Sequence, residues 1–161
     1  MQKTIQLETP IGLLTIAGDE AAVTHVFWSM DKGNPHDGAN NDNGATPVLR
    51  TAAAQLREYF DGKRKVFDVP LNPAGGGFFQ RVWAILRRDV SYGTTISYSA
   101  LAALAGSPRA ARAVGMANHR NPIPIFIPCH RVLGKHGALT GFRSGVDKKA
   151  WLLQLERGAN P

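Results

Sequence analysis

The segment at residues 121–132 has the clearest capacity for chemistry. It reads NPIPIFIPCHRV, an apolar run with three prolines that ends in Cys129, His130 and Arg131. Proline disfavours a regular helix or a central strand, so the segment should present Cys129 from a rigid, irregular backbone. The basic side chains that follow would lower the pKa of the thiol and favour the nucleophilic thiolate. A lone buried cysteine more often acts as a small hydrophobic residue, and that interpretation remains open at this point.

Other kinds of site have little support. Cys129 is the single cysteine of 161 residues, which excludes an intramolecular disulfide and a cysteine-rich zinc site, and is typical of a reducing cytoplasm. The five histidines show no H-x-x-x-H pair, so we expect no metal and no cofactor. No apolar run approaches the roughly 18 residues that span a membrane. The first 20 residues also lack the apolar stretch of a secretory signal, so we expect a cytoplasmic protein with no membrane partner.

Charge is distributed unevenly along the chain. The net charge is +7, made up of −2 in residues 1–77 and +9 in residues 78–161. A basic half beside a mildly acidic half indicates that one half meets a polyanion such as nucleic acid. A solvated basic surface without a partner has nearly equal support from charge alone.

The elements that must position these residues indicate an α+β fold. In the N-terminal part, three short β-rich runs with tight connections predict an antiparallel sheet, and apolar residues between Val48 and Phe60 recur with helical spacing. Residues 31–46 hold no aliphatic side chain larger than alanine and predict a mobile loop. We therefore expect a small α/β domain at 1–77 that ends in a linker at about 61–77.

Residues 78–161 predict a mainly helical domain. Ser97 is a suitable N-cap for a helix at 98–105, and Gly106 suits its C-terminal end. A second helix should run over 108–120 with Pro108 at its first position. Two short helices joined at a glycine are typical of a winged-helix-like helix-turn-helix, with arginines on one face of the second helix towards a phosphate backbone. This half would then be the DNA-binding and catalytic domain.

Around Cys129 the sequence resembles the O6-alkylguanine-DNA alkyltransferases, also called methylated-DNA–protein-cysteine methyltransferases. The segment Ile-Pro-Cys-His-Arg-Val is a specific signature of that family. The resemblance also covers 79–83, 97–98, 111–115, 121–122, 140–142 and 149–153, and in the N-terminal half mainly 9–12. It implies a DNA repair protein that moves the alkyl group of O6-alkylguanine, and of O4-alkylthymine, irreversibly to its own Cys129 in one turnover.

The resemblance also implies the catalytic roles. Cys129 would accept the alkyl group, and His130 would take the thiol proton through a water. Glu156 would orient His130, and Asn121 would tie the segment together by hydrogen bonds. Without the family pattern, His130 could be a packed core histidine and Glu156 a solvated acid at the end of a helix.

The implied partner is double-stranded DNA containing O6-alkylguanine, bound through the minor groove by a monomer. Base flipping is required, because O6 in a stacked pair is out of reach of a buried thiol. Tyr98 would help to extrude the nucleotide and would donate a hydrogen bond to the guanine edge, and Arg112 would fill the space that the nucleotide leaves. Without the resemblance both could be ordinary surface residues. The DNA-binding set is Arg112, Tyr98, Arg109, Ala113, Gly115, Asn118 and Arg131. The substrate pocket is Tyr98, Pro124, Phe142, Arg143 and Ser144.

The sequence departs from the family pattern at the lip of this pocket. Phe142 stands where many members have tyrosine, and Arg143 and Ser144 replace a smaller pair, which puts the range of alkyl groups in doubt.

Three other functions remain open. An alkyltransferase-like protein would bind alkylated DNA but lacks the acceptor cysteine, a helix-turn-helix regulator leaves the Pro-Cys-His segment unexplained, and a thiol hydrolase would need an oxyanion site that the sequence does not show.

Overall fold

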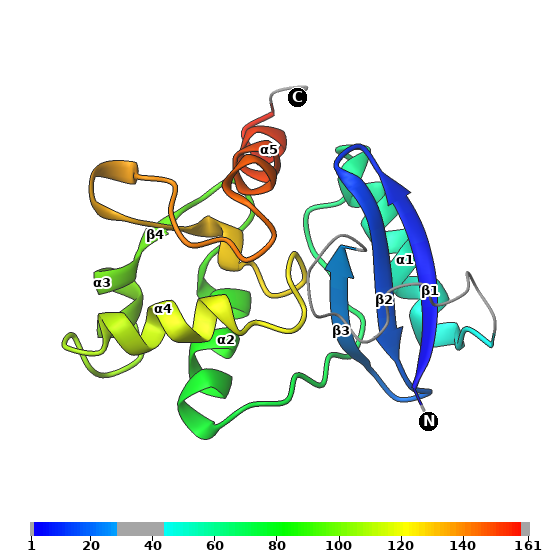
Figure 1. The fold of residues 1–161 in the computed structure, drawn as a ribbon, viewed down its shortest axis with the longest axis horizontal. Coiled ribbons are helices and arrows are strands. Elements are labelled where there is room, and N and C mark those ends of the chain that lie inside the picture. Colours follow the sequence, from blue (N-terminus) through cyan, green and yellow to red (C-terminus); the bar gives the residue numbers. More distant parts are fainter. Residues whose placement is uncertain (1, 29–43, 159–161) are drawn as a thin grey trace. The chain divides into compact units, whose positions relative to one another are not determined.

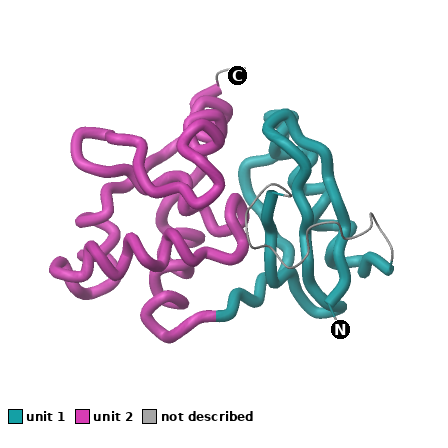
Figure 2. Tube along the Cα trace, viewed as in Figure 1, with its two compact units in different colours: residues 1–74 teal, residues 75–161 magenta. Residues whose placement is uncertain are grey.

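The computed structural model describes residues 2–28 and 44–158, and its fold is α+β (Figure 1). The chain divides into two compact units, Met1–Ala74 and Gly75–Pro161 (Figure 2). The division falls within the linker predicted at about 61–77. Most of the predicted mobile loop, residues 31–43, lies outside the described residues. Within 2–28 and 44–158, no helix is long and apolar enough to cross a membrane.

The first unit is a three-stranded antiparallel sheet with one helix. The strands β1 (Lys3–Thr9), β2 (Gly12–Gly18) and β3 (Val23–Trp28) are hydrogen-bonded in that order. The helix α1 (Pro47–Phe60) contacts all three strands. Thr46 caps it by accepting a hydrogen bond from the Leu49 amide at 3.3 Å, and Leu49 and Leu56 are fully buried in its apolar face. The predicted antiparallel sheet with a helix is confirmed.

The second unit is mainly helical. Its helices are α2 (Gly77–Asp89), α3 (Tyr98–Leu104), α4 (Ala111–His119) and α5 (Val146–Glu156). Two short 3₁₀ turns, η1 (Cys129–Arg131) and η2 (Lys135–Gly137), lie between α4 and α5. The short strands β4 (Ile96–Ser97) and β5 (Val132–Leu133) pair in parallel, so the chain directly after η1 is fixed beside the start of α3.

The helices α3 and α4 form the predicted helix-turn-helix, packed on α2. Ser97 caps α3 as expected, accepting from the Ala100 amide at 3.1 Å. The buried indole of Trp83 on α2 donates to the Ala117 carbonyl of α4 at 2.9 Å. The predicted start of the second helix at Pro108 is wrong. Residues 107–110 form a separate turn, closed by a hydrogen bond from the Ala110 amide to the Ser107 carbonyl at 2.9 Å, so α4 begins at Ala111.

Candidate active site

The Asn121 side chain organises the irregular segment that leads to Cys129. Its Oδ1 accepts from the Ile123 amide at 2.9 Å, and its Nδ2 donates to the Ile127 carbonyl at 2.9 Å. The same Nδ2 lies 3.1 Å from Cys129 Sγ. Ile125 within the loop has φ of +75°, which a β-branched residue rarely adopts. One buried carboxamide therefore holds a strained loop closed and donates directly to the sulfur.

The Cys129 thiol is buried and protonated at rest. It begins η1 and is only 5% exposed. Burial raises the pKa of Cys129, and the hydrogen bond from Asn121 and the charge of Lys149 offset part of that rise. The prediction that His130 and Arg131 would lower the thiol pKa is wrong, because burial dominates and the favourable cation is Lys149. The thiol therefore needs a base to become a nucleophile.

His130 is placed to be that base. Its Nε2 lies 2.6 Å from Oε2 of Glu156, and both side chains are buried. Burial lowers the pKa of His130 more than Glu156 raises it, so the imidazole is neutral. A neutral ring that donates from Nε2 keeps Nδ1 as an acceptor. Nδ1 is buried and has no hydrogen-bond partner among the described residues.

Glu156 is held as a carboxylate. Burial opposes its ionisation, but hydrogen bonds and charge from His130 and Arg131 outweigh burial and keep the pKa of Glu156 far below its ordinary value. Arg131 donates from Nε to Oε1 at 2.7 Å and from Nη2 to Oε2 at 3.1 Å. Its Nη1 donates to the Val90 carbonyl at 2.7 Å. Glu156 thus joins α5 to η1 and, through Arg131, to the end of α2.

Two of the predicted DNA-binding residues are buried in the structure. The Arg131 guanidinium is buried and donates to Glu156 and Val90, so it does not face DNA. Asn118 is 4% exposed on the inner side of α4 and is not offered to a phosphate backbone. Charged and polar residue types predict exposure to solvent, and nothing in the local sequence indicates that these two side chains turn inwards.

Lys149 is the functional residue that sequence reasoning missed. It is fully buried on α5, and its Nζ donates to the carbonyls of Val132 and Thr140, both at 2.6 Å. Burial lowers the pKa of Lys149, and the proximity of Cys129 opposes that shift. A signal was present, because Lys149 precedes the buried Leu152 and Leu153 at helical spacing and so belongs to the inner face of α5.

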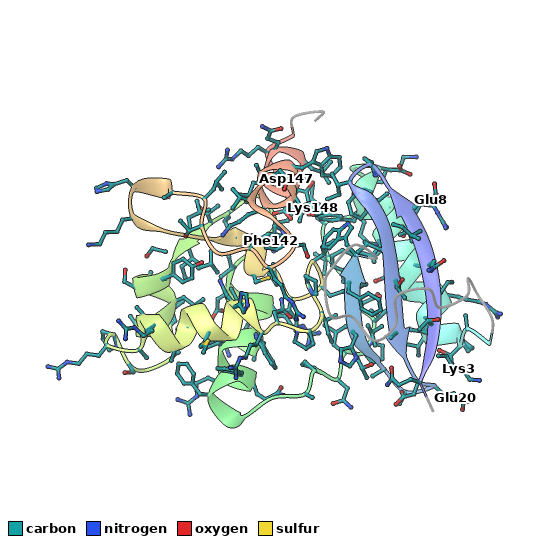
Figure 3. All side chains as sticks on the ribbon, in the orientation of Figure 1. Lys3, Glu8, Glu20, Phe142, Asp147 and Lys148 are labelled. Atoms are coloured by element: carbon teal, nitrogen blue, oxygen red, sulfur yellow. The ribbon has the colours of Figure 1, made fainter. Side chains whose placement is uncertain are left out.

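The other predicted site residues lie before and after Cys129 in the sequence. Tyr98 is half-buried at the start of α3, and its hydroxyl donates to the Thr140 carbonyl at 3.4 Å, the same carbonyl that Lys149 binds. Arg109 and Arg112 are exposed, the first in the turn before α4 and the second on α4. Figure 3 shows Phe142 on the loop that leads to Asp147 and Lys148 at the start of α5. Within the described residues no three His, Cys, Asp or Glu side chains gather as metal ligands.

Comparison with known proteins identifies this arrangement. Residues 77–158 match the family profile described as 6-O-methylguanine DNA methyltransferase, DNA binding domain, and residues 3–73 match the ribonuclease-like domain of the same enzymes. The chain belongs to the 6-O-methylguanine DNA methyltransferase family. The predicted resemblance to this family is confirmed.

Similar proteins in this methyltransferase family cover almost the whole chain. A constitutive methylated-DNA–protein-cysteine methyltransferase of Bacillus subtilis is 48% identical, over 93% of this chain and 92% of the relative. One from Methanosarcina acetivorans is 44% identical over 92% and 94%. The crystal structure of the Mycobacterium tuberculosis O6-methylguanine methyltransferase superposes with a TM-score of 0.88 at 41% identity, covering 100% of this chain and 96% of that one. A complex of the M. tuberculosis protein with DNA gives a TM-score of 0.86 at 42% identity, covering 96% and 92%.

Proposed function

We propose that this protein repairs DNA by transferring the alkyl group of O6-alkylguanine, and of O4-alkylthymine, irreversibly to Sγ of Cys129. The relatives above are named as methylated-DNA–protein-cysteine methyltransferases. The observation that carries the assignment to Cys129 is its surroundings: a donor from Asn121 at 3.1 Å and, on the next residue, an imidazole held by Glu156 with Nδ1 left as an acceptor.

The transfer is an in-line displacement at the alkyl carbon. The bond from Sγ to carbon forms while the bond from carbon to O6 breaks, and the electron pair returns to the purine. The thiol proton passes through a water to Nδ1 of His130 and finally to the purine ring, so that the products are a thioether and an unmodified guanine. Ionised Glu156 stabilises the transient imidazolium, as the third member of a nucleophile–base–orienter set does elsewhere. The thioether is a poor leaving group, which makes the step irreversible.

DNA binds to the helix-turn-helix that α3 and α4 form. Because Cys129 is only 5% exposed, the alkylated nucleotide must leave the duplex to react. Tyr98 assists this extrusion, Arg112 fills the gap in the stack, and Arg109 binds the backbone. We propose entry from the minor groove, where the small side chains Ala113 and Gly115 allow close approach of α4. Pro124, Phe142, Arg143 and Ser144 line the pocket with Tyr98, and the protein acts as a cytoplasmic monomer.

An alkyltransferase-like protein that binds damage without repair is the second candidate. The presence of Cys129, with Asn121 donating to its sulfur, argues against it.

The direct test is incubation with duplex DNA that carries O6-[methyl-³H]guanine, followed by counting the label bound to protein. Wild-type protein should acquire label, and Cys129→Ser should acquire none while binding the same DNA. Equal labelling of both proteins would refute Cys129 as the acceptor. Binding without any labelling of wild-type protein would favour the alkyltransferase-like function.

A further inference from the structure

The turn at Tyr92 and Gly93, between α2 and β4, contacts the C-terminal end of α5. The Tyr92 hydroxyl donates to the Leu155 carbonyl, and the Gly93 amide donates to Oε1 of Glu156, both at 3.4 Å. Each of these hydrogen bonds joins residues that are 63 positions apart in the sequence. The turn therefore binds the part of α5 that carries the carboxylate facing His130.

Glycine at position 93 allows this close approach. Its φ is +81°, in the left-handed region that glycine adopts without strain. A Cβ at this position would lie 3.3 Å from the Glu156 carbonyl oxygen, so a side chain would press the turn away from α5. The Gly93 amide can thus reach the Glu156 carboxylate from the side opposite to η1 in the sequence.

The ring of Tyr92 lies against Arg131, the ion-pair partner of Glu156. The guanidinium carbon of Arg131 is 5.8 Å from the centroid of this ring, within the range of a cation–π contact. The side chains of Arg131 and Glu156 are 7% and 1% exposed, whereas Tyr92 is partly exposed. The ring therefore lies between the ion pair and solvent, where it keeps water from the two charges.

The two oxygens of the Glu156 carboxylate have different tasks. Oε1 accepts from Nε of Arg131 at 2.7 Å and from the Gly93 amide. Oε2 accepts from Nη2 of Arg131 at 3.1 Å and lies 2.6 Å from Nε2 of His130. A two-point contact with arginine fixes the orientation of a carboxylate. If Arg131 turned towards water, Oε2 would no longer be held in place at the imidazole.

Charged groups of α5 and η1 face His130. Burial has the largest effect and lowers the pKa of His130, Glu156 opposes this shift, and Arg131 and Lys149 add to it. Tyr92 itself is uncharged near neutral pH, because burial and the charge of Glu156 raise the pKa of its hydroxyl. Tyr92 can therefore act on His130 only through Arg131 and Glu156 and through the exclusion of water.

We propose that Tyr92 is a positioning residue for methyl transfer. Its ring holds Arg131 on the Glu156 carboxylate and excludes water, while Gly93 fixes the same carboxylate from the turn, so that Oε2 stays directed at Nε2 of His130. The imidazole is then kept as the tautomer with a proton on Nε2, and Nδ1 is left as the acceptor for the thiol proton. The inference rests on the proposed function and adds to it a residue that touches neither the thiol nor the base.

The test compares variants with and without the ring. Tyr92→Leu and Tyr92→Met remove the ring, and Tyr92→Phe keeps it and loses only the long hydrogen bond of the hydroxyl. Thr95→Ala, at an exposed position of the same connection, is the matched control. The single-turnover rate of methyl transfer is measured for each protein, in excess over duplex DNA that contains O6-methylguanine.

A second measurement separates positioning from folding. NMR spectroscopy of each protein without DNA follows the proton on Nε2 of His130, which is assigned by its absence from His130→Asn, and the exchange of this proton with solvent. The buried indole proton of Trp83, which donates to a backbone carbonyl of α4, is the internal reference. Its exchange reports on opening of the whole unit.

We expect the two variants without the ring to transfer the methyl group about tenfold more slowly, the magnitude of a partly desolvated cation–π contact. The Nε2 proton of His130 should exchange about tenfold faster in them, because water reaches the ion pair. The Trp83 proton should exchange as in wild type. Tyr92→Phe and Thr95→Ala should match wild type in both measurements.

An unchanged transfer rate or an unchanged exchange of the His130 proton in the variants without the ring would overturn the inference. So would equal acceleration of exchange at His130 and Trp83, or failure of both variants to fold, since these are the results for a purely structural residue. A loss in Tyr92→Phe as large as that in Tyr92→Leu would assign the effect to the hydroxyl and reject the ring. A wild-type protein that transfers no methyl group would refute the proposed function, and the exchange measurement would still decide whether Tyr92 protects the contact between Glu156 and His130.

Discussion

At the scale of single residues, the reactivity of Cys129 depends on groups that act as its proton leaves. Burial keeps the thiol protonated, so the thiolate exists only with help from the Asn121 donor, the Lys149 charge and the neutral His130. This arrangement protects the single cysteine from adventitious alkylation and oxidation, because the resting thiol is a poor nucleophile. The contribution of the Lys149 charge to thiolate formation can be tested by substitution.

Lys149→Met should raise the pKa of the Cys129 thiol, because it removes the cation that favours the thiolate. It also leaves the carbonyls of Val132 and Thr140 without their donor, at a cost of about 1–3 kcal/mol in the free energy of unfolding. The measurement is the rate of iodoacetamide alkylation of the single cysteine between pH 6 and pH 10. Exposed Lys135→Met is the control and should match wild type. An unchanged alkylation profile for Lys149→Met would show that the charge does not reach the sulfur.

The resemblance to the family predicted part of this site. The family pattern implied the pairing of His130 with Glu156 and the hydrogen bonds of Asn121, and both are present in the structure. Where Arg131 and Lys149 point could not be predicted, since each basic side chain is satisfied by a backbone carbonyl or a carboxylate distant in sequence. Sequence gives the charge of a side chain, and tertiary packing decides which group it faces.

At the scale of elements, Glu156 connects three parts of the second unit. Its carboxylate binds His130 and Arg131 of η1, and Arg131 in turn binds the Val90 carbonyl after α2. Removing one partner of a buried ion pair leaves an uncompensated charge, which is far more costly than breaking an exposed pair.

Glu156→Gln should therefore destabilise the protein by about 3 kcal/mol or more and should slow methyl transfer. Glu58→Gln, which breaks the exposed ion pair with Arg64, should cost less than about 1 kcal/mol. Urea denaturation of the two variants and wild type gives both values. Similar losses in the two variants would contradict a buried network.

The same network sets the response of stability to acid. The pKa of Glu156 lies below its ordinary value of 4.5 in the folded state, so its stabilisation is complete above about pH 4.5 and is lost as the pH falls towards the folded pKa. Neutral, buried His130 has a pKa below its ordinary 6.5, so it adds a loss of stability that begins below about pH 6.5. Urea denaturation should show that the stability of wild type falls below about pH 6.5 and falls further below about pH 4.5, and Glu156→Gln should lack the further loss.

Arg112 gives a prediction that belongs to the helix α4. Because Arg112 is exposed on α4 and is proposed to fill the gap that the extruded base leaves, Arg112→Ala should slow repair of duplex DNA far more than it slows reaction with the free base O6-benzylguanine, which needs no extrusion. Arg109→Ala, in the turn before the helix, should weaken DNA binding without this difference. Equal slowing on duplex and free base would remove Arg112 from base flipping.

The helix-turn-helix was predictable because its signals are local. Ser97 caps α3, and the small and apolar residues of α4 fall on a buried face. The start of α4 was not predictable, since Pro108 permits either a first helical turn or an isolated turn. The hydrogen bond from the Ala110 amide to the Ser107 carbonyl closes an isolated turn, so α4 begins at Ala111.

At the scale of the whole molecule, the +9 charge of residues 78–161 should govern DNA affinity. Binding that neutralises phosphates releases counterions, so the logarithm of the association constant should fall linearly with the logarithm of salt concentration. A protein that repairs damage in any context should also bind different sequences with nearly equal affinity. Fluorescence anisotropy with unmodified duplexes of several sequences measures both properties. A flat salt dependence, or a strong preference for one sequence, would contradict a backbone-driven encounter.

We expect Cys129 to be consumed once per repair event. This expectation is tested most directly by titrating a fixed amount of protein with duplex DNA that carries one labelled O6-methylguanine, followed by mass spectrometry of the peptides. Transfer should stop at one methyl group per protein molecule, with every methyl group on Cys129, and Cys129→Ser should take up none. More than one methyl group removed per protein molecule, or methylation of any other residue, would contradict it.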